Sequence, residues 1–302
     1  MAAGLVAWLL NSVSVPLVVS AVASASLDSL LLAFGTVTLS VYLEAFRTKI
    51  IAQSQGIPVT TSKMLAIDLG ASFFALFLPL GTLSRGAIRI VGLAKIGAGA
   101  SAASVVIFRD RLESTSVMAL LGLCAWVFAS PSHSGLAGLL TAGAVVATVI
   151  VYLIVFTPMG FPGAVRWGWI PGVQRFAQLR ESIGRARTMS ARVQLELLAY
   201  SLVMHSLIVM TFYFLARSLD LDIPLVTMAW VRSAVTLITM LPVSIGGIGL
   251  RETAMLFFLS PSGVAEAQAV ALAFLAFVFL VLVPGLAGGV LEAGSGLRKL
   301  RS

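Results

Sequence analysis

Long apolar stretches, separated by short polar or charged breaks, dominate the pattern of this chain. An α-helix needs about 20 mostly apolar residues to cross the hydrocarbon core of a bilayer. About six stretches satisfy that requirement as full spans. They lie near residues 4–23, 27–46, 115–130, 136–156, 194–216 and 265–291. The pattern therefore predicts an all-α polytopic integral membrane protein.

Two further apolar stretches, 64–108 and 223–260, are interrupted by proline and glycine. The first breaks near Pro79, and the second breaks between Pro242 and Gly249. Lipid cannot satisfy the backbone groups that such breaks release, so the breaks must be buried in protein or line a wet cavity. We expect each stretch to form a re-entrant hairpin of broken helices rather than a full span.

The placement of Lys and Arg predicts the orientation. Six arginines and a single acid occupy the loop 157–193, and the tail beyond residue 292 is also basic. Both segments are expected in the cytoplasm, as are both termini. An even number of crossings then separates them, so the hairpin 223–260 enters from outside. The same count makes the hairpin 64–108 enter from the cytoplasm.

Paired, interrupted helices that approach from opposite faces indicate an inverted repeat with a site near the membrane midplane. The chain is then a single transmembrane domain, 1–302. Its two repeat halves are about 27–156 and 194–292, joined by the basic cytoplasmic loop 157–193. We expect a multi-pass protein of the cell (inner) membrane.

Several charges receive simple structural interpretations. Glu44 and Arg47 are three residues apart on one helix face, which favours a local ion pair. Residues 109–113 are expected to form a charged cytoplasmic corner between the first hairpin and the next span. Glu196 and His205 are expected to be helix-packing partners within one span.

The segment 241–252 carries the candidate chemistry. Its glycines leave backbone N–H groups open to a ligand, and the positive end of the helix that starts near Leu250 favours an anion. Arg251 can bind a phosphate through two hydrogen bonds, and Glu252 can hold Arg251, cap the helix or bind a cationic headgroup. A plainer alternative is that the glycines allow close helix packing and that Arg251 pairs with Glu252. The candidate substrate-binding residues are Arg251, Glu252, Gly246, Gly247, Gly249 and Ser244, with Arg85, Asp68 and Arg232 near the two breaks.

Composition narrows the function further. Of 302 residues, 59% are hydrophobic and 11% are charged, whereas a soluble domain carries about 25% charged residues. A single cysteine cannot form an intramolecular disulfide or a cysteine-based metal cluster, and two histidines are too few for a histidine-rich metal site. We therefore expect no cofactor. The net charge of +8 is explained by the cytoplasmic loops rather than by nucleic acid. The sequence also lacks a phosphate loop of ATPases.

Residues 241–252, Leu-Pro-Val-Ser-Ile-Gly-Gly-Ile-Gly-Leu-Arg-Glu, closely resemble the C-terminal signature of the lysylphosphatidylglycerol synthase transmembrane, or flippase-like, family. The earlier stretch from Leu78 to Arg85 is similar to that family's first Leu-Pro block, although Gly81-Thr82-Leu83 departs from the commoner glycine-acid pattern. The resemblance extends from about residue 27 to 292. It implies movement of lipids or lipid-linked intermediates between leaflets. Several members of the family carry a soluble aminoacyl transferase domain after the membrane part. The sequence up to Ser302 contains no such domain, so a lysyl-transfer activity is not expected.

The leading hypothesis is a lipid flippase or transporter, not an enzyme, that binds an anionic or phosphate-bearing headgroup near the midplane. One alternative is an integral-membrane transferase that uses lipid-phosphate donors, with Glu252 or Asp68 as the base. Another is a non-catalytic subunit of an envelope lipid or glycan synthesis complex. A homo-oligomer is compatible with each of them.

Overall fold

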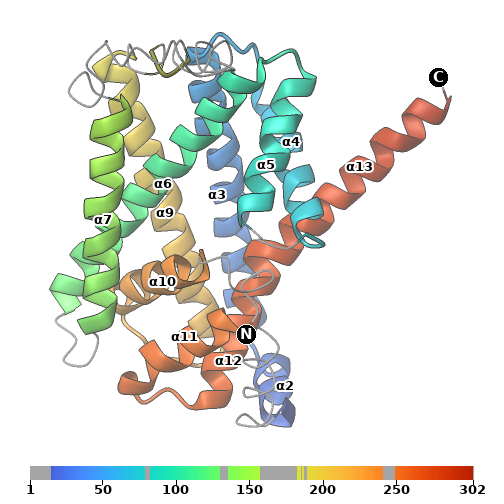
Figure 1. Cartoon of the computed structure of the whole chain (residues 1–302). Helices are drawn as coiled ribbons and strands as arrows, with labels where there is room; N and C mark the ends of the chain where they lie inside the picture. The colour runs from blue at the N-terminus through green and yellow to red at the C-terminus, as the bar shows by residue number, and fades with distance from the viewer. Residues whose placement is uncertain are drawn as a thin grey trace.

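The computed structural model describes residues 15–78, 82–129, 135–156, 182–184, 186, 189–240 and 249–301, and within these ranges the chain forms helices and turns and no strand (Figure 1). Five helical runs are long and apolar enough to cross a membrane. They are α3 (Leu27–Ser54), α6 (Ala100–Ala129), α7 (Gly135–Phe156), α9 (Ala191–Ser218) and a continuous run of α12 (Glu266–Phe277), a π-helical turn (Val278–Leu282) and α13 (Val283–Arg301). The prediction of an all-α polytopic membrane protein is confirmed. The remaining predicted span, near residues 4–23, is described only from Val15 onward, where it forms α2 (Val15–Ala23).

Four short helices account for the two interrupted stretches. They are α4 (Thr61–Ala75), α5 (Thr82–Lys95), α10 (Leu225–Thr239) and α11 (Leu250–Leu259). At 1.5 Å per residue each is at most about 22 Å long, which is less than the roughly 30 Å hydrocarbon core. The pair α4–α5 lies in the upper half of the bundle and the pair α10–α11 in the lower half (Figure 1). The sequence between the members of each pair, 79–81 and 241–248, lies outside the described residues.

The predicted charged corner at residues 109–113 is wrong. These residues lie inside the continuous helix α6, and the chain turns earlier, at Gly97, which has a φ of 94°. Arg109, Asp110 and Glu113 are buried there. Because charges that are paired inside the protein need no water, the helix does not have to end where they occur. The first hairpin consequently closes at Lys95 rather than at residue 108.

Helices α3 and α9 run antiparallel and pack along their length (Figure 1). Polar contacts fix their register at three levels. The Ser26 N–H donates to the Ser218 carbonyl (2.9 Å), Thr36 and Thr211 share a hydroxyl hydrogen bond (2.9 Å), and the Arg47 guanidinium donates to Ser201 Oγ (2.7 Å). The short helices α4 and α10 pack against this antiparallel pair, α4 on α3 and α10 on α9.

Two helices of the first half have the same lengths as two helices of the second half. Helices α3 and α9 have 28 residues each, and α4 and α10 have 15 each. The turn after α3 has its N–H groups of Gln55 and Ile57 bonded to the Ala52 carbonyl, and the turn after α9 repeats both bonds onto Ala216. Gly56 and Asp220, at the same place in these turns, both have positive φ values of 78° and 56°.

Equivalent helices also pack in equivalent ways. Helix α4 packs along α13, as α10 packs along α6. Both contacts are closest at a glycine: a Cβ on Gly288 of α13 would lie 2.0 Å from the Leu69 carbonyl oxygen, and one on Gly122 of α6 would lie 2.4 Å from the Ser233 Cβ. Small residues allow such close approach where helices associate within lipid.

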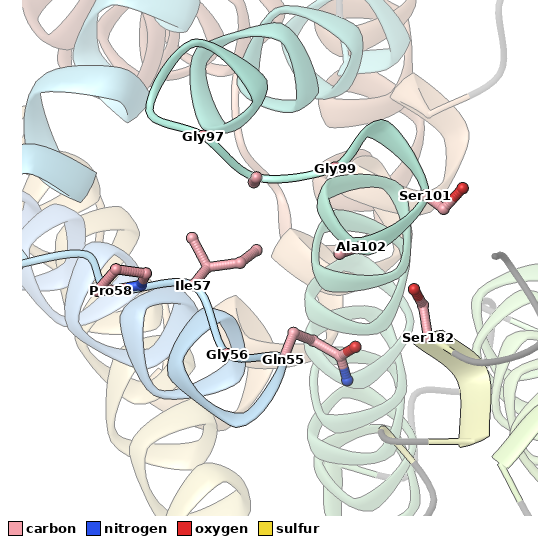
Figure 2. A pocket seen from close by; sticks show the side chains of 10 residues that line it. Gln55, Gly56, Ile57, Pro58, Gly97, Gly99, Ser101, Ala102 and Ser182 are labelled. Atoms are coloured by element: carbon pink, nitrogen blue, oxygen red, sulfur yellow. The ribbon is translucent and has the colours of Figure 1, made fainter.

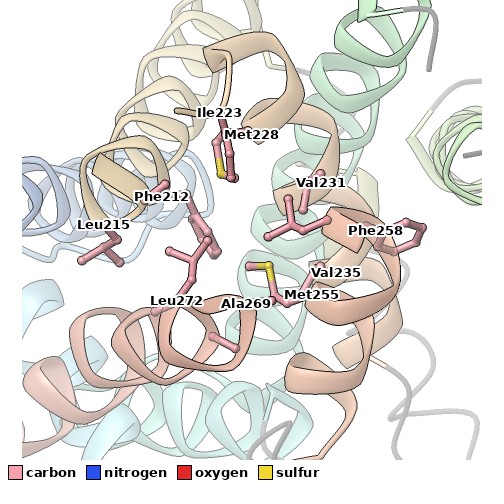
Figure 3. Packing of buried hydrophobic residues seen from close by; sticks show 14 of the residues in the cluster. Phe212, Leu215, Ile223, Met228, Val231, Val235, Met255, Phe258, Ala269 and Leu272 are labelled. Atoms are coloured by element: carbon pink, nitrogen blue, oxygen red, sulfur yellow. The ribbon is translucent and has the colours of Figure 1, made fainter. Parts of the chain in front are cut away.

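The core of the second half lies where α9, α10, α11 and α12 meet. Figure 3 shows Phe212, Met228, Val231, Met255 and Leu272 directed into this space. A separate apolar cluster holds α3, α4, α5 and α6 together in the first half. Each short-helix pair is therefore anchored by an apolar core of its own.

Candidate functional site

A network of buried ion pairs joins α3, α4, α5 and α6. Arg89 of α5 stands at its centre, with Nε 2.6 Å from Asp68 Oδ1 and Nη1 3.0 Å from Asp110 Oδ2. Arg47 of α3 binds the other oxygen of Asp110, with Nη2 at 2.5 Å from Oδ1. All four side chains are at most 2% exposed. One arginine thus connects carboxylates from two different helices.

Glu44 and Arg85 extend this network toward a less buried edge. Arg85 Nη2 lies 3.1 Å from Glu44 Oε2, and Arg89 Nη1 lies 3.7 Å from Glu44 Oε1. The Thr48 hydroxyl accepts from Arg89 and donates to Asp110. The network balances three carboxylates against three guanidinium groups: Glu44, Asp68 and Asp110 with Arg47, Arg85 and Arg89.

The depth of the network makes this balance necessary. Arg47 precedes the end of α3 by seven residues, or about 10 Å along the helix axis. An unpaired charge at the centre of a bilayer costs about 2.5–3.5 kcal/mol on insertion scales, and removal of one member of a buried pair costs about 3–5 kcal/mol. Mutual pairing therefore allows α4 and α5 to carry charges inside the bundle.

The predicted local pair of Glu44 and Arg47 is wrong, because each side chain pairs with another helix instead. Two predicted site residues, Asp68 and Arg85, do belong to one network, and Arg89 links them. Sequence reasoning missed Arg89 and Asp110 as members. The spacing of Arg85 and Arg89, four residues apart and thus on one face of a helix, was the available signal.

The second half has a different charge content at the corresponding places. Asp68 and Arg232 are each the eighth residue of their helices, α4 and α10. When α9 is aligned with α3 from their first residues, Thr211 takes the position of Arg47. The same alignment of α12 with α6 places Ala276 at the position of Asp110. The carboxylates of the first half thus have no counterpart here.

Arg232 is 4% exposed, yet its Nε and Nη1 atoms carry no hydrogen bond. Within the part of the chain that the structure describes, no carboxylate forms an ion pair with it. A buried cation with neither a counter-ion nor full hydrogen bonding is costly, and such residues in membrane helices mark functional sites.

His205 of α9 is a second buried polar side chain of the bundle. The ring is 4% exposed, its Nε2 is 3.1 Å from the hydroxyl of Ser114 on α6, and its Nδ1 has no hydrogen-bond partner. The predicted packing of His205 with Glu196 is wrong: Glu196 instead pairs with Arg192 at the surface, 3.2 Å apart. His205 thus faces the bundle interior, while Glu196 faces outward.

The start of α11 contains the described part of the signature segment. Gly249 has a φ of 85°, which favours glycine, and its N–H donates to Glu252 Oε2 (2.7 Å). Glu252 therefore caps the helix, which was one of the roles predicted for it. The Arg251 guanidinium lies over the Phe277 ring, 5.4 Å from its centroid. Three other predicted site residues, Ser244, Gly246 and Gly247, lie outside the described residues.

A cavity of about 270 Å³ opens at the end of the bundle where α3 ends and α6 begins. Figure 2 shows Gly56, Ile57 and Pro58 on one side and Gly97, Gly99 and Ser101 on another. The Gln55 amide, oriented so that both its ends are satisfied, donates to the Ser182 carbonyl (3.0 Å) and accepts from the Ala186 N–H (3.1 Å). None of the predicted site residues lines this cavity.

Comparison with known proteins agrees with this architecture. A family model described as the lysylphosphatidylglycerol synthase TM region matches residues 1–288. No curated protein matches the chain significantly. The match covers nearly all of the sequence and confirms the resemblance carried by residues 241–252. The chain therefore belongs to the family of lysylphosphatidylglycerol synthase transmembrane regions.

Proposed function

We propose that this protein moves a phosphate-bearing lipid, or a lipid-linked intermediate, between the two leaflets of the membrane. Membership of a lipid-related membrane family supports a lipid as the substrate. The observation that carries the proposal is the pair of short-helix hairpins at opposite ends of the bundle, both of which bring arginines into its interior. Charged side chains inside a membrane bundle are energetically costly, so their presence there favours a function within the membrane.

The two halves, about 27–156 and 194–292, act as an inverted repeat in this proposal. Support comes from the matching lengths of α3 and α9, the matching turns after them, and the equivalent packing of α4 and α10. In inverted-repeat transporters, one half rocks against the other around a fixed site. The antiparallel pair α3–α9 is suited to be the axis of such a movement, because both halves attach to it.

The charge content of the halves favours an anionic headgroup. In the first half, Arg47, Arg85 and Arg89 pair with carboxylates, whereas Arg232 in the second half has no ion-pair partner in the described part of the chain. A guanidinium group binds phosphate through two parallel hydrogen bonds. The headgroup phosphate would neutralise a charge that the protein leaves unpaired.

A leaflet-resolved lipid assay in proteoliposomes tests the proposal. Arg251→Ala and Gly247→Leu are expected to slow lipid movement, because both change the signature segment. Arg217→Ala serves as the matched control, since Arg217 pairs with Asp222 at the exposed end of α9 and belongs to no buried network. Unchanged movement in both signature variants would overturn the proposal.

The same preparation separates transport from the other functions. A transferase would convert purified lipid substrate into a covalent product, which mass spectrometry detects, whereas a transporter yields unmodified lipid. A subunit of a synthesis complex would move no lipid alone. It would also be affected more by changes in the arginines of the 157–193 loop than by changes in residues 241–252.

A further inference from the structure

We infer that the π-helical turn Val278–Leu282, together with Pro284, is a hinge about which α13 moves relative to the apolar core of the second half. Helix α13 carries α4 with it in this movement, while α12 stays in the core. The inference goes beyond the proposed function and rests on it only for the expectation that lipid movement uses the hinge. The bending itself can be measured without any transport.

The first support is the backbone where α12 passes into α13. The Val283 N–H donates to the Val278 carbonyl, five residues earlier, whereas α-helical bonds reach back four residues. The next residue, Pro284, has no N–H to donate to the Leu280 carbonyl. Two consecutive positions thus depart from the α-helical bonding pattern. Prolines and π-helical turns are the usual places at which long helices kink, and such turns are frequent at functional sites.

The second support is the anchoring of α12 on one side of this turn. Ala269 and Leu272 lie in the apolar core that α12 shares with α9, α10 and α11 (Figure 3). Ala276, one turn further along, belongs to the same core, and all three residues are at most 1% exposed. Helix α12 is therefore fixed to the second half up to the residues that precede the π-helical turn.

Helix α13, on the other side of the turn, is held by a different neighbour. It leaves the bundle alongside α4 (Figure 1). The close contact of Gly288 with Leu69 continues at Gly285, where an added Cβ would lie 2.6 Å from Leu76 Cδ1. Val290 is exposed, by contrast, so the packing of α13 is one-sided. Because α4 belongs to the core of the first half, one continuous helical run connects both cores through the turn.

The third support is that the equivalent helix of the first half has no such turn. Helix α6 is α-helical from Ala100 to Ala129 and contains no proline. It also reaches both cores, since Ala103 and Val106 lie in the first and Ala125 packs against the second. One helix thus links the cores without interruption, and the other links them through a weakened backbone. Bending between the cores is consequently concentrated where α12 meets α13.

Spin-label distance measurements in vesicles of phosphatidylethanolamine and phosphatidylglycerol test the inference. In a Cys124→Ala background, Glu266→Cys and Ala293→Cys carry a label pair that spans the hinge, and Ala100→Cys and Val127→Cys carry a matched pair on α6. All four labelled positions are exposed, and the members of each pair are 27 residues apart. We expect a broad or two-peaked distance distribution for the hinge pair and a narrow one for the α6 pair. A static kink would make both distributions equally narrow, which would overturn the inference.

Pro284→Ala tests whether the bending occurs at this turn. Alanine supplies an N–H for the Leu280 carbonyl, so the hinge-pair distribution should narrow to the width of the α6 pair. The thermal unfolding midpoint should be unchanged or higher, because alanine is favoured over proline inside a helix. Pro261→Ala, in the exposed turn before α12, is the matched control and should leave the distribution broad. A distribution that stays equally broad in Pro284→Ala would refute the hinge.

Lipid movement in the same vesicles keeps the inference separate from the transport proposal. Loss of lipid movement in Pro284→Ala, with the thermal midpoint retained, would support the use of the hinge in transport. A hinge-pair distribution that is broad in the wild type and narrow in Pro284→Ala, without any lipid movement, would establish the hinge and refute the transport proposal. Lipid movement by a wild type whose hinge pair is narrow would refute the hinge and leave the transport proposal intact.

Discussion

Asp68 and Arg232 occupy the same position, the eighth residue, of the two matching 15-residue helices α4 and α10, and they carry opposite charges. Asp68 forms an ion pair with Arg89 at 2.6 Å, whereas Arg232 has no ion-pair partner among the described residues. The buried carboxylate of α4 is thus neutralised by an arginine, whereas the buried arginine of α10 has no carboxylate partner in the described part of the chain. This asymmetry is the basis on which we propose a ligand-binding role for Arg232.

Removal of Arg89 should destabilise the protein strongly. Arg89→Met leaves Asp68 without its partner and Asp110 with only one arginine, so we expect the free energy of unfolding to fall by about 3–5 kcal/mol. Asp68→Leu in the same chain should recover part of this loss, because the uncompensated carboxylate is also removed. Chemical unfolding in detergent measures the effect. Arg192→Met, which breaks an exposed pair with Glu196, should change stability by less than about 1 kcal/mol. Strictly additive losses in the Arg89 and Asp68 variants would contradict this account.

The glycine contact between α13 and α4 should tolerate no side chain. Gly288→Ala would place a Cβ 2.0 Å from the Leu69 carbonyl oxygen, and backbone cannot move aside as a flexible side chain can. We expect the thermal unfolding midpoint to fall by several degrees, since overpacking costs about 1–3 kcal/mol. Gly143→Ala in α7 is the matched control, because no atom lies within 4 Å of its added Cβ. It should be neutral or stabilising by up to about 1 kcal/mol. Equal midpoints for the two variants would refute the close contact.

A carboxylate introduced into the core that α10 and α11 share should compete with an anionic ligand for Arg232. Met255 of α11 is buried in this apolar core, so Met255→Glu would place an acid in the half that contains Arg232. We expect the affinity for inorganic phosphate to fall about tenfold or more. Met255→Gln, of similar size but without charge, should retain most of the affinity. If the glutamine variant loses as much binding as the glutamate variant, packing rather than charge explains the effect.

Side-resolved labelling should place the two ends of the bundle on opposite sides of the membrane. Helix α4 begins near the upper end of the bundle in Figure 1, and α9 ends near the lower end. Lys63 lies in the first turn of α4 and Asp222 follows α9; both are exposed. In a Cys124→Ala background, Lys63→Cys should react with an impermeant thiol reagent from the cytoplasmic side only, because the basic loop 157–193 is predicted there. Asp222→Cys should react from the outside only. Reaction of both from one side would contradict the predicted hairpin topology.

The sequence alone determined the class and the course of the chain. Apolar stretches of sufficient length predict spans, because backbone hydrogen bonding inside lipid leaves the helix as the main solution. The positions of Pro79 and Pro242 located the two stretches that do not cross as single helices. The unusual charges Asp68 and Arg232 were identifiable because intramembrane charges are rare. These features depend on composition and local pattern, which a single chain displays directly.

Only the tertiary structure decided which charges are paired. Arg47 meets Asp110 from 63 residues away, and His205 meets Ser114 from 91 residues away. No local sequence pattern encodes contacts between residues that lie so far apart along the chain. The same pairing explains why α6 continues through residues 109–113: a partner supplied by another helix replaces water, so a charged run that predicts a corner becomes the middle of a buried helix.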